Sequence, residues 1–345
     1  MFVKASIKVF FCVYLTFLLS FPSFSQAYKF RNYGVDNGIL QPYIYTINQD
    51  KNGYLFVGTG EGLCKYDGIK FKSFYAKDGL AESFVTTSFK DKARNIWLGH
   101  NEGSVTFFDG KNFKSINTSS FAKSPITCII EDTKGFIWCS TQNDGVFRVS
   151  QDFQVEVFKL EFNQENIFTI SFTKNDQLLV GTDEGLVLYG LISNNRTPKY
   201  LSVIDGIPIT KINCIHKKNN SGSYWIATEN EGLFLLTPSK DPSEFYKADA
   251  IGKNIGIDFT NIQDVYEDAH SNLWLATFGN GVIKLVLSEN SLQYDEFFNF
   301  TEDNGLGSKY TKTIYADHEG NIWIGTYGNG LVQLIDNCFT FVKKH

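Results

Sequence analysis

The chain has 345 residues, a length that allows one large all-β domain or two ordinary domains. Its formal net charge is −5, with 32 Lys and Arg against 37 Asp and Glu, which argues against a nucleic-acid-binding protein. Apolar residues make up 43% and aromatic residues 16% of the chain, with 29 glycines and 7 prolines. This composition is typical of a globular protein and favours strands joined by tight turns.

Residues 1–25 have the pattern of a secretory signal peptide. Lys4 and Lys8 supply positive charge, an apolar run of about 13 residues ends at Phe21, and the small residue Ser25 precedes the predicted cleavage site. An uncleaved membrane anchor is the alternative, but a spanning helix needs ~20 apolar residues. We therefore expect an exported chain, periplasmic or secreted, with no membrane span after cleavage. Loss of the two lysines changes its net charge from −5 to −7.

The rest of the chain is a sevenfold repeat. Each copy reads apolar, aromatic or leucine, apolar, small residue, then Thr or His, and a short turn ending in Gly follows. The copies end at Thr59, His100, Thr141, Thr182, Thr228, Thr277 and Thr326, with spacings of 41, 41, 41, 46, 49 and 49 residues. All five tryptophans occupy the second position of this phrase.

Each unit has an alternating segment before this phrase and two short strand-like segments after it. Four strands at a period of ~40–45 residues are the signature of a propeller blade. The sequence therefore predicts an all-β fold, a single seven-bladed β-propeller over residues 26–345 with four antiparallel strands per blade. The units are placed at about 41–80, 81–121, 122–163, 164–206, 207–255, 256–306 and 307–342.

Two segments compete to close the ring. Residues 28–40 are similar to the fourth strand and exit loop at Phe71–Leu80, so the chain begins with an outer strand, placed at 28–36. Pairing of this strand with the last blade would remove the exposed sheet edges. The tail Phe339–Val342 could take the same place, and the sequence leaves both alternatives open.

The units resemble the two-component regulator propeller repeat. The phrase DHEGNIWIGT at residues 317–326, with Gly330 and Leu331, fits that repeat, and DNGL at 303–306 and KDGL at 77–80 match its exit loop. The resemblance covers about residues 28–342. It implies the extracytoplasmic sensor region of hybrid two-component systems of Bacteroidetes-type bacteria, many of which sense glycans.

The resemblance also implies partners. Such propellers usually precede an immunoglobulin-like domain, a membrane helix and a histidine kinase, and many relatives have two rings where this chain has one. The sequence contains no kinase, receiver or DNA-binding segment, so only the sensing part carries over. The expected partners are an extracellular small molecule or oligosaccharide, and a membrane-bound histidine kinase, a second propeller or an immunoglobulin-like domain.

No catalytic residue, cofactor or metal site is expected. The five histidines lack metal-ligand spacing, and neither a nucleophile elbow nor a P-loop or dinucleotide fingerprint occurs. His100, which replaces the repeat's Thr, is expected to make a structural hydrogen bond. The five cysteines after the signal form no C-x-x-C pair, which gives little support to a disulfide framework. A propeller hydrolase or lyase acting on extracellular carbohydrate, and a non-catalytic scaffold, remain alternatives.

The predicted ligand-binding surface is one face of the ring, where loops leading into first strands meet the loops between second and third strands. There, units six, seven and one place aromatic rings beside amides, which suits the apolar faces and hydroxyls of a sugar. The candidate residues are Phe278, Asn280, Tyr327, Asn329, Tyr310, Tyr43, Glu61 and Glu231. We expect the rings to stack on the ligand and the amides to bond to it. The two glutamates would disfavour acidic ligands unless a cation bridges them.

Overall fold

The computed structural model describes residues 28–118, 120–160, 166–192, 196–219, 221–241, 244–251, 261–288 and 293–335. The predicted signal peptide and the tail Phe339–Val342 lie outside these residues. In the described part of the chain, no helix is long and apolar enough to cross a membrane.

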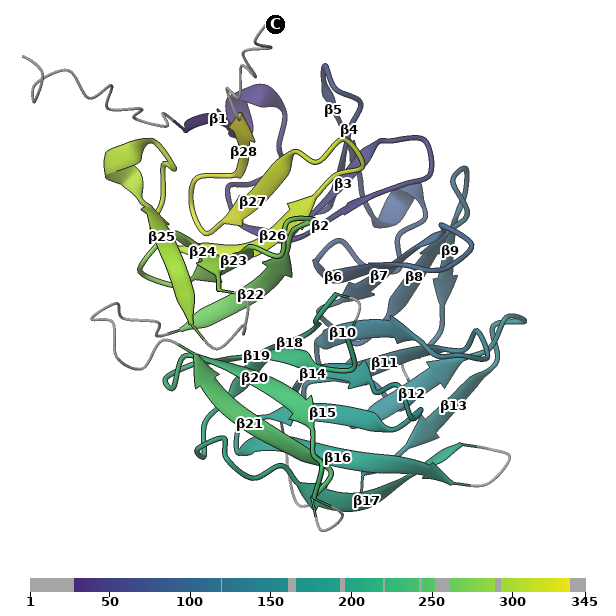
Figure 1. The fold of residues 1–345 in the computed structure, drawn as a ribbon. Helices are drawn as coiled ribbons and strands as arrows, with labels where there is room; N and C mark the ends of the chain where they lie inside the picture. The colour runs from purple at the N-terminus through teal and green to yellow at the C-terminus, as the bar shows by residue number, and fades with distance from the viewer. Residues whose placement is uncertain are drawn as a thin grey trace, which may run out of the picture. The chain divides into compact units, whose positions relative to one another are not determined.

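Phe30–Ile335 form one compact unit of seven four-stranded antiparallel sheets, the blades of a β-propeller (Figure 1). Blades one to four comprise β2 (Ile44–Gln49), β3 (Leu55–Thr59), β4 (Leu63–Tyr66), β5 (Phe71–Phe74); β6 (Val85–Lys90), β7 (Ile96–His100), β8 (Val105–Phe108), β9 (Phe113–Ile116); β10 (Ile126–Glu131), β11 (Ile137–Thr141), β12 (Val146–Val149), β13 (Val155–Phe158); and β14 (Ile167–Phe172), β15 (Leu178–Thr182), β16 (Gly185–Ile192), β17 (Thr197–Val203). Blades five to seven comprise β18 (Ile212–Lys217), β19 (Tyr224–Thr228), β20 (Leu233–Pro238), β21 (Tyr246–Ile251); β22 (Ile262–Glu267), β23 (Leu273–Thr277), β24 (Val282–Leu287), β25 (Tyr294–Phe300); and β26 (Thr311–Ala316), β27 (Ile322–Thr326), β28 (Leu331–Ile335), β1 (Lys29–Tyr33). The predicted fold class and strand number per blade are confirmed.

The N-terminal strand closes the ring. β1 pairs with β28 as the outer strand of blade seven. Its last residue, Tyr33, is buried; the ring centroid lies 5.8 Å from that of Trp323 and 5.4 Å from that of Tyr66, and the hydroxyl donates to Gln333 Oε1 at 3.1 Å. Because Tyr66 belongs to blade one, a single side chain of β1 packs against both ends of the ring.

The recurring exit loop is a one-turn 3₁₀ helix that ends on a glycine. It occurs as η1 (Val35–Asn37), η2 (Ala76–Asp78) and η3 (Glu302–Asn304). The glycines that end these turns are left-handed, with φ of 100° at Gly38, 108° at Gly79 and 95° at Gly305. Glycine adopts this conformation without a steric cost, which explains the repeated Gly-Leu or Gly-Ile exit.

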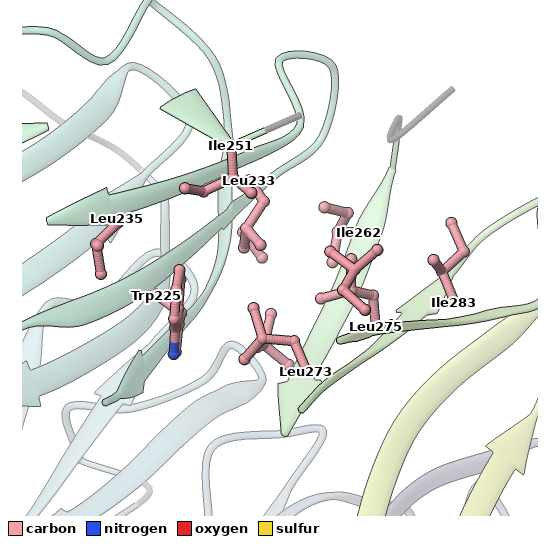
Figure 2. Close-up of a cluster of buried hydrophobic side chains, with 11 residues drawn as sticks. Trp225, Leu233, Leu235, Ile251, Ile262, Leu273, Leu275 and Ile283 are labelled. Carbon is pink, nitrogen blue, oxygen red and sulfur yellow. The ribbon is translucent and has the colours of Figure 1, made fainter. Parts of the chain in front are cut away.

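Apolar side chains from second and third strands fill the space between blades. Figure 2 shows one such cluster, where Trp225, Leu233 and Leu235 of blade five face Leu273 and Leu275 of blade six. All of these side chains are at most 5% exposed. The second strands are buried on both faces, as expected for sheets packed between two neighbours.

The small residue of the repeat is matched to the side chain that faces it on the first strand. Four blades pair Thr with Gly, and three pair Cys or Asp with Ser or Ala. The pairs are Thr46–Gly58, Thr87–Gly99, Thr169–Gly181 and Thr313–Gly325, against Cys128–Ser140, Cys214–Ala227 and Asp264–Ala276. A Cβ on Gly181 would lie 2.6 Å from Thr169 Cγ2 and 2.8 Å from Ile212 Cγ2 of the next blade. The β-branched methyl group therefore requires glycine opposite it.

The aspartate turn between first and second strands holds the tryptophan. Asp317 Oδ1 accepts the backbone N–H groups of Glu319 and Asn321, and Oδ2 accepts Trp323 Nε1–H at 2.8 Å. The same carboxylate–indole bond joins Asp91 to Trp97, Asp132 to Trp138 and Asp268 to Trp274. These oxygens are occupied by donors of the protein, which agrees with a structural turn rather than a calcium loop.

Candidate functional site

The two sets of loops predicted to share a face do so. Neighbouring strands of a blade are antiparallel, so successive connections lie at alternating ends. Isolated β-bridges join Tyr43, which precedes β2, to Tyr327, which follows β27, and join Phe278 to Tyr310. We call the face with these loops the loop face.

Four of the predicted site residues form one group, which we call the loop-face aromatic cluster: Tyr43, Phe278, Tyr310 and Tyr327. Ring centroids are separated by 4.9 Å for Phe278 and Tyr310, 5.4 Å for Phe278 and Tyr327, and 6.3 Å for Tyr43 and Tyr327. Tyr43, Phe278 and Tyr310 are 46%, 43% and 38% exposed. The cluster thus offers ring surface to solvent from blades one, six and seven.

The other four candidates occupy turns. The backbone N–H groups of Asn280, Asn329, Glu61 and Glu231 each donate to the hydroxyl of the Thr that ends the second strand, at 3.0–3.2 Å. The side chain of Asn329 donates to Asn32 Oδ1 at 3.3 Å. Glu61 and Glu231 are exposed. The backbone of these four residues therefore has a structural role in the turns. A contact of their side chains with a ligand stays a prediction.

Sequence reasoning missed a ring of side chains around the central channel. The register of every first strand shifts at its second residue, which is the mark of a β-bulge. The bulged residues are Tyr45, Thr86, Thr127, Phe168, Asn213, Gln263 and Lys312, and all seven line one cavity of about 550 Å³. That volume lies in the ordinary range of small-ligand sites, ~300–1,000 Å³.

The loop-face aromatic cluster adjoins this channel. Tyr327 belongs to both, because it lines the cavity and its ring lies 5.9 Å from that of Tyr45. Phe84 continues the aromatic wall 4.8 Å beyond Tyr45. Burial raises the pKa of Tyr327 to about 12, so its hydroxyl is neutral at physiological pH.

The part of the channel wall formed by the first strands of blades five to seven is polar and charged. Asn213 Nδ2 donates to Ile262 O at 2.9 Å, and Lys312 Nζ donates to Gln263 Oε1 at 3.0 Å. Lys211 lies 3.7 Å from Glu229 and 4.2 Å from the centre of the Phe168 ring. The channel thus has an aromatic side and a side rich in hydrogen-bond donors.

One carboxylate, Asp264, lies on the same wall. Its Oδ2 accepts Thr313 Oγ1–H at 2.9 Å and the Ile314 N–H at 3.0 Å. Its Oδ1 accepts the Val265 N–H at 2.9 Å and the Cys214 thiol at 3.5 Å. Both oxygens are therefore bonded to the protein.

His100 makes structural hydrogen bonds, as expected. Its side chain is fully buried, with Nδ1 3.0 Å from Phe84 O and Nε2 2.8 Å from Thr106 Oγ1. Burial lowers its pKa to about 4, so the imidazole is neutral. In the other blades the corresponding turn N–H donates to the hydroxyl of the repeat's Thr. Blade two has His100 in place of this Thr, and the Glu102 N–H donates to the Glu82 carboxylate at 2.8 Å instead.

Within the described ranges, no three His, Cys, Asp or Glu residues are placed to hold a metal. Cys64, Cys128, Cys139 and Cys214 are free thiols whose pKa values burial raises. Raised values make these groups weak nucleophiles.

A signal for the channel residues was present in the sequence. The second residue of the first strand differs between blades, from Tyr to Thr, Phe, Asn, Gln and Lys, while its neighbours repeat. Because the side chain at this position varies while the strand around it is repeated, it is not required for packing between blades. Alternation alone could not show it, since the bulge adds a residue and changes which side chains point inward.

Residues 305–328 match the family model described as "Two component regulator propeller". They span one exit glycine, the first strand β26, the aspartate turn and the second strand β27 of blade seven. The chain therefore carries the two component regulator propeller repeat, which confirms the resemblance recognised in its sequence.

Solved structures of the same fold include extracellular domains of putative two component systems and a lyase. The extracellular domains of two putative hybrid two component systems of B. thetaiotaomicron superpose with TM-scores of 0.70 and 0.66 at 22% and 20% identity, over 90% and 89% of this chain. The chain spans 42% and 39% of their lengths. Virginiamycin B lyase from Staphylococcus aureus gives a TM-score of 0.68 at 14% identity, covering 89% of this chain and 99% of the lyase. Curated proteins compared by sequence give no match. At these identities the likeness establishes the fold.

Proposed function

We propose that this chain is the extracytoplasmic, ligand-binding propeller of a two-component signalling system, and that it is a sensor module rather than an enzyme. The family repeat at residues 305–328 supports this assignment. The shared fold with extracellular domains of hybrid two component systems agrees with it, as does the signal-peptide pattern of residues 1–25. Signal output requires a partner, and a membrane-bound histidine kinase is the one the family suggests.

The ligand binds on the loop face, over the mouth of the central channel, and is an oligosaccharide. The observation that carries this proposal is the convergence of Tyr43, Phe278, Tyr310 and Tyr327 from three blades beside a cavity of about 550 Å³. Exposed rings supply stacking surface for the apolar faces of sugar rings, and the hydroxyl and amide groups of the channel wall supply polar partners.

Binding of a panel of neutral and uronate-containing oligosaccharides, measured by calorimetry, tests the location of the site. We expect Phe278→Ala and Tyr327→Ala each to weaken the binding of panel members at least tenfold. The matched control is Phe245→Ala, since Phe245 is 47% exposed but lies between β20 and β21, at the other end of the strands. Equal effects of Phe278→Ala and Phe245→Ala would place the ligand elsewhere.

The hydrolase or lyase alternative predicts that a bound oligosaccharide is converted by the purified chain alone. We expect each oligosaccharide of the panel that binds to be recovered unchanged after prolonged incubation with the protein. New reducing ends or unsaturated products that disappear in a channel variant would favour the enzyme.

A further inference from the structure

We infer that the ligand carries a carboxylate, and that Lys312 binds this carboxylate inside the channel. The inference rests on the proposed function and refines it, because it selects acidic oligosaccharides, such as those built from uronic acids, among the possible ligands. The groups that carry it are Lys312, Gln263, Asn213 and Lys211, all on the polar wall of the cavity.

Lys312 is a cation without a carboxylate partner. Its ammonium donates to the neutral amide oxygen of Gln263 at 3.0 Å, and no carboxylate of the described residues lies within 4 Å of it. Burial lowers its pKa, the nearby charge of Lys211 lowers it further, and Asp264 and Cys214 oppose the shift. A desolvated ammonium that lacks a counter-ion is costly, and an incoming carboxylate would supply one.

The neighbouring acid, Asp264, favours the charged form of Lys312 but makes no direct ion pair with it. All four acceptor bonds of Asp264 go to groups of blades five, six and seven, so its lone pairs are in use. Of the charged residues that line the cavity, Lys211 and Lys312 stand against Asp264 alone. Because Glu229 already pairs with Lys211, Lys312 is the one of these two lysines that has no carboxylate within 4 Å.

A structural role explains Lys312 poorly. The bulge position tolerates Thr in blades two and three, where Thr86 Oγ1 donates to Ile126 O of the next blade at 2.7 Å. Asn213 makes the equivalent bond to Ile262 O with one of its two N–H groups. Neutral side chains thus occupy the bulge position in other blades of the same geometry, which indicates that the fold does not require a charge there.

The acidic turns of the loop face do not prevent this binding. Glu61 and Glu231 are exposed to solvent, where charge–charge interactions are weak and are screened by salt. Lys312 lies inside the cavity, where a direct ion pair is stronger than in water. The expectation that Glu61 and Glu231 disfavour acidic ligands thus stays a prediction for the exposed turns, and the inference applies to the channel at Lys312.

Oligogalacturonides of two to four residues and their methyl esters provide a matched test, because the ester removes the charge and retains the sugar skeleton. We expect the acid to bind at least tenfold more tightly than the ester in calorimetry. Lys312→Met should reduce the affinity for the acid to that for the ester, while Lys312→Arg should retain a preference for the acid. Lys211→Met should have a smaller effect, because Glu229 already pairs with Lys211.

Lys123→Met is the control for general electrostatics. Lys123 is exposed on the loop face before β10, so this variant removes the same charge from the same face outside the channel. A loss equal to that of Lys312→Met, or equal binding of acid and ester by the wild type, would overturn the inference. In the second case, sensitivity of both ligands to Tyr327→Ala would leave the proposed site intact. Failure of every acidic and neutral oligosaccharide of the panel to bind would count against the proposed function itself.

Discussion

Two strands of each blade follow opposite rules. The second strand repeats in all seven units, is buried on both faces and, in four blades, ties its tryptophan to the aspartate turn. The first strand repeats its buried residues but varies at the bulge, where each side chain lines the channel. The repetition of the second strand reflects its packing between blades. The variation of the first strand at the bulge is expected for a surface whose side chains can differ without loss of packing.

Blade five shows how packing survives a local change. Lys218 stands where five of the other blades have the turn aspartate, and Trp225 donates instead to Glu267 Oε2 of blade six at 2.9 Å. Lys218 lies 3.8 Å from the same carboxylate. The indole N–H thus keeps an acidic acceptor, although the acceptor comes from the neighbouring blade.

The largest expected effect is the loss of closure. A chain that begins at Gly34 lacks β1, and with it the contacts of Tyr33 to blades seven and one. We expect the melting temperature to fall by about 10 °C or more, because burial of a large aromatic side chain alone is worth ~3–5 kcal/mol. Differential scanning calorimetry of both chains measures this. An unchanged melting temperature would show that another segment completes blade seven.

The second prediction concerns His100, the departure from the repeat in a second strand. Its pKa of about 4 in the folded state lies below the ordinary 6.5, so folding is favoured when the imidazole is neutral. This contribution is present above pH ~6.5 and is lost as pH falls towards 4, by up to ~3 kcal/mol. His100→Gln cannot bind the proton. Urea unfolding at pH 7 and pH 4.5 should therefore show a smaller acid-induced loss for the variant, and identical losses would contradict it.

A smaller effect tests the matching of Thr with Gly. Gly181→Ala places a methyl group against Thr169 and Ile212, and overpacking of this kind costs ~1–3 kcal/mol. Thr169→Cys removes the opposing methyl group, and the resulting Cys–Ala pair copies that of blade five, so the double variant should regain part of the loss. Chemical denaturation of the single and double variants measures the coupling. Additive effects would mean that the two side chains are independent.

The smallest expected effect separates function from packing. Lys312→Met should raise the free energy of unfolding by ~1 kcal/mol, because it removes a desolvated charge that has no carboxylate partner. Lys123→Met, at an exposed lysine, should leave the free energy of unfolding almost unchanged. A loss of several kcal/mol for Lys312→Met would assign this lysine to the fold.

Most of the fold could be predicted because the same sequence pattern recurs in each of the seven blades. The position of the tryptophans, the small residue and the exit glycine determine the strands, and Tyr43, Phe278, Tyr310 and Tyr327 meet because the ring closes. The closing segment could not be predicted, since residues 28–36 and the C-terminal tail are both strand-like. The channel wall was missed because the bulge changes side-chain direction, so strand alternation does not show which residues point inward; only the variation at the second residue of the first strand marks them.

The central claim is that the ligand binds at the channel mouth between the loop-face aromatic cluster and Lys312. A crystal structure of the chain with the tightest-binding oligosaccharide of the panel tests it most directly. Our account predicts a sugar ring stacked on Phe278 or Tyr327 and a carboxylate oxygen about 3 Å from Lys312 Nζ. A ligand bound at the opposite face, or on the outer strands with the channel empty, would contradict it.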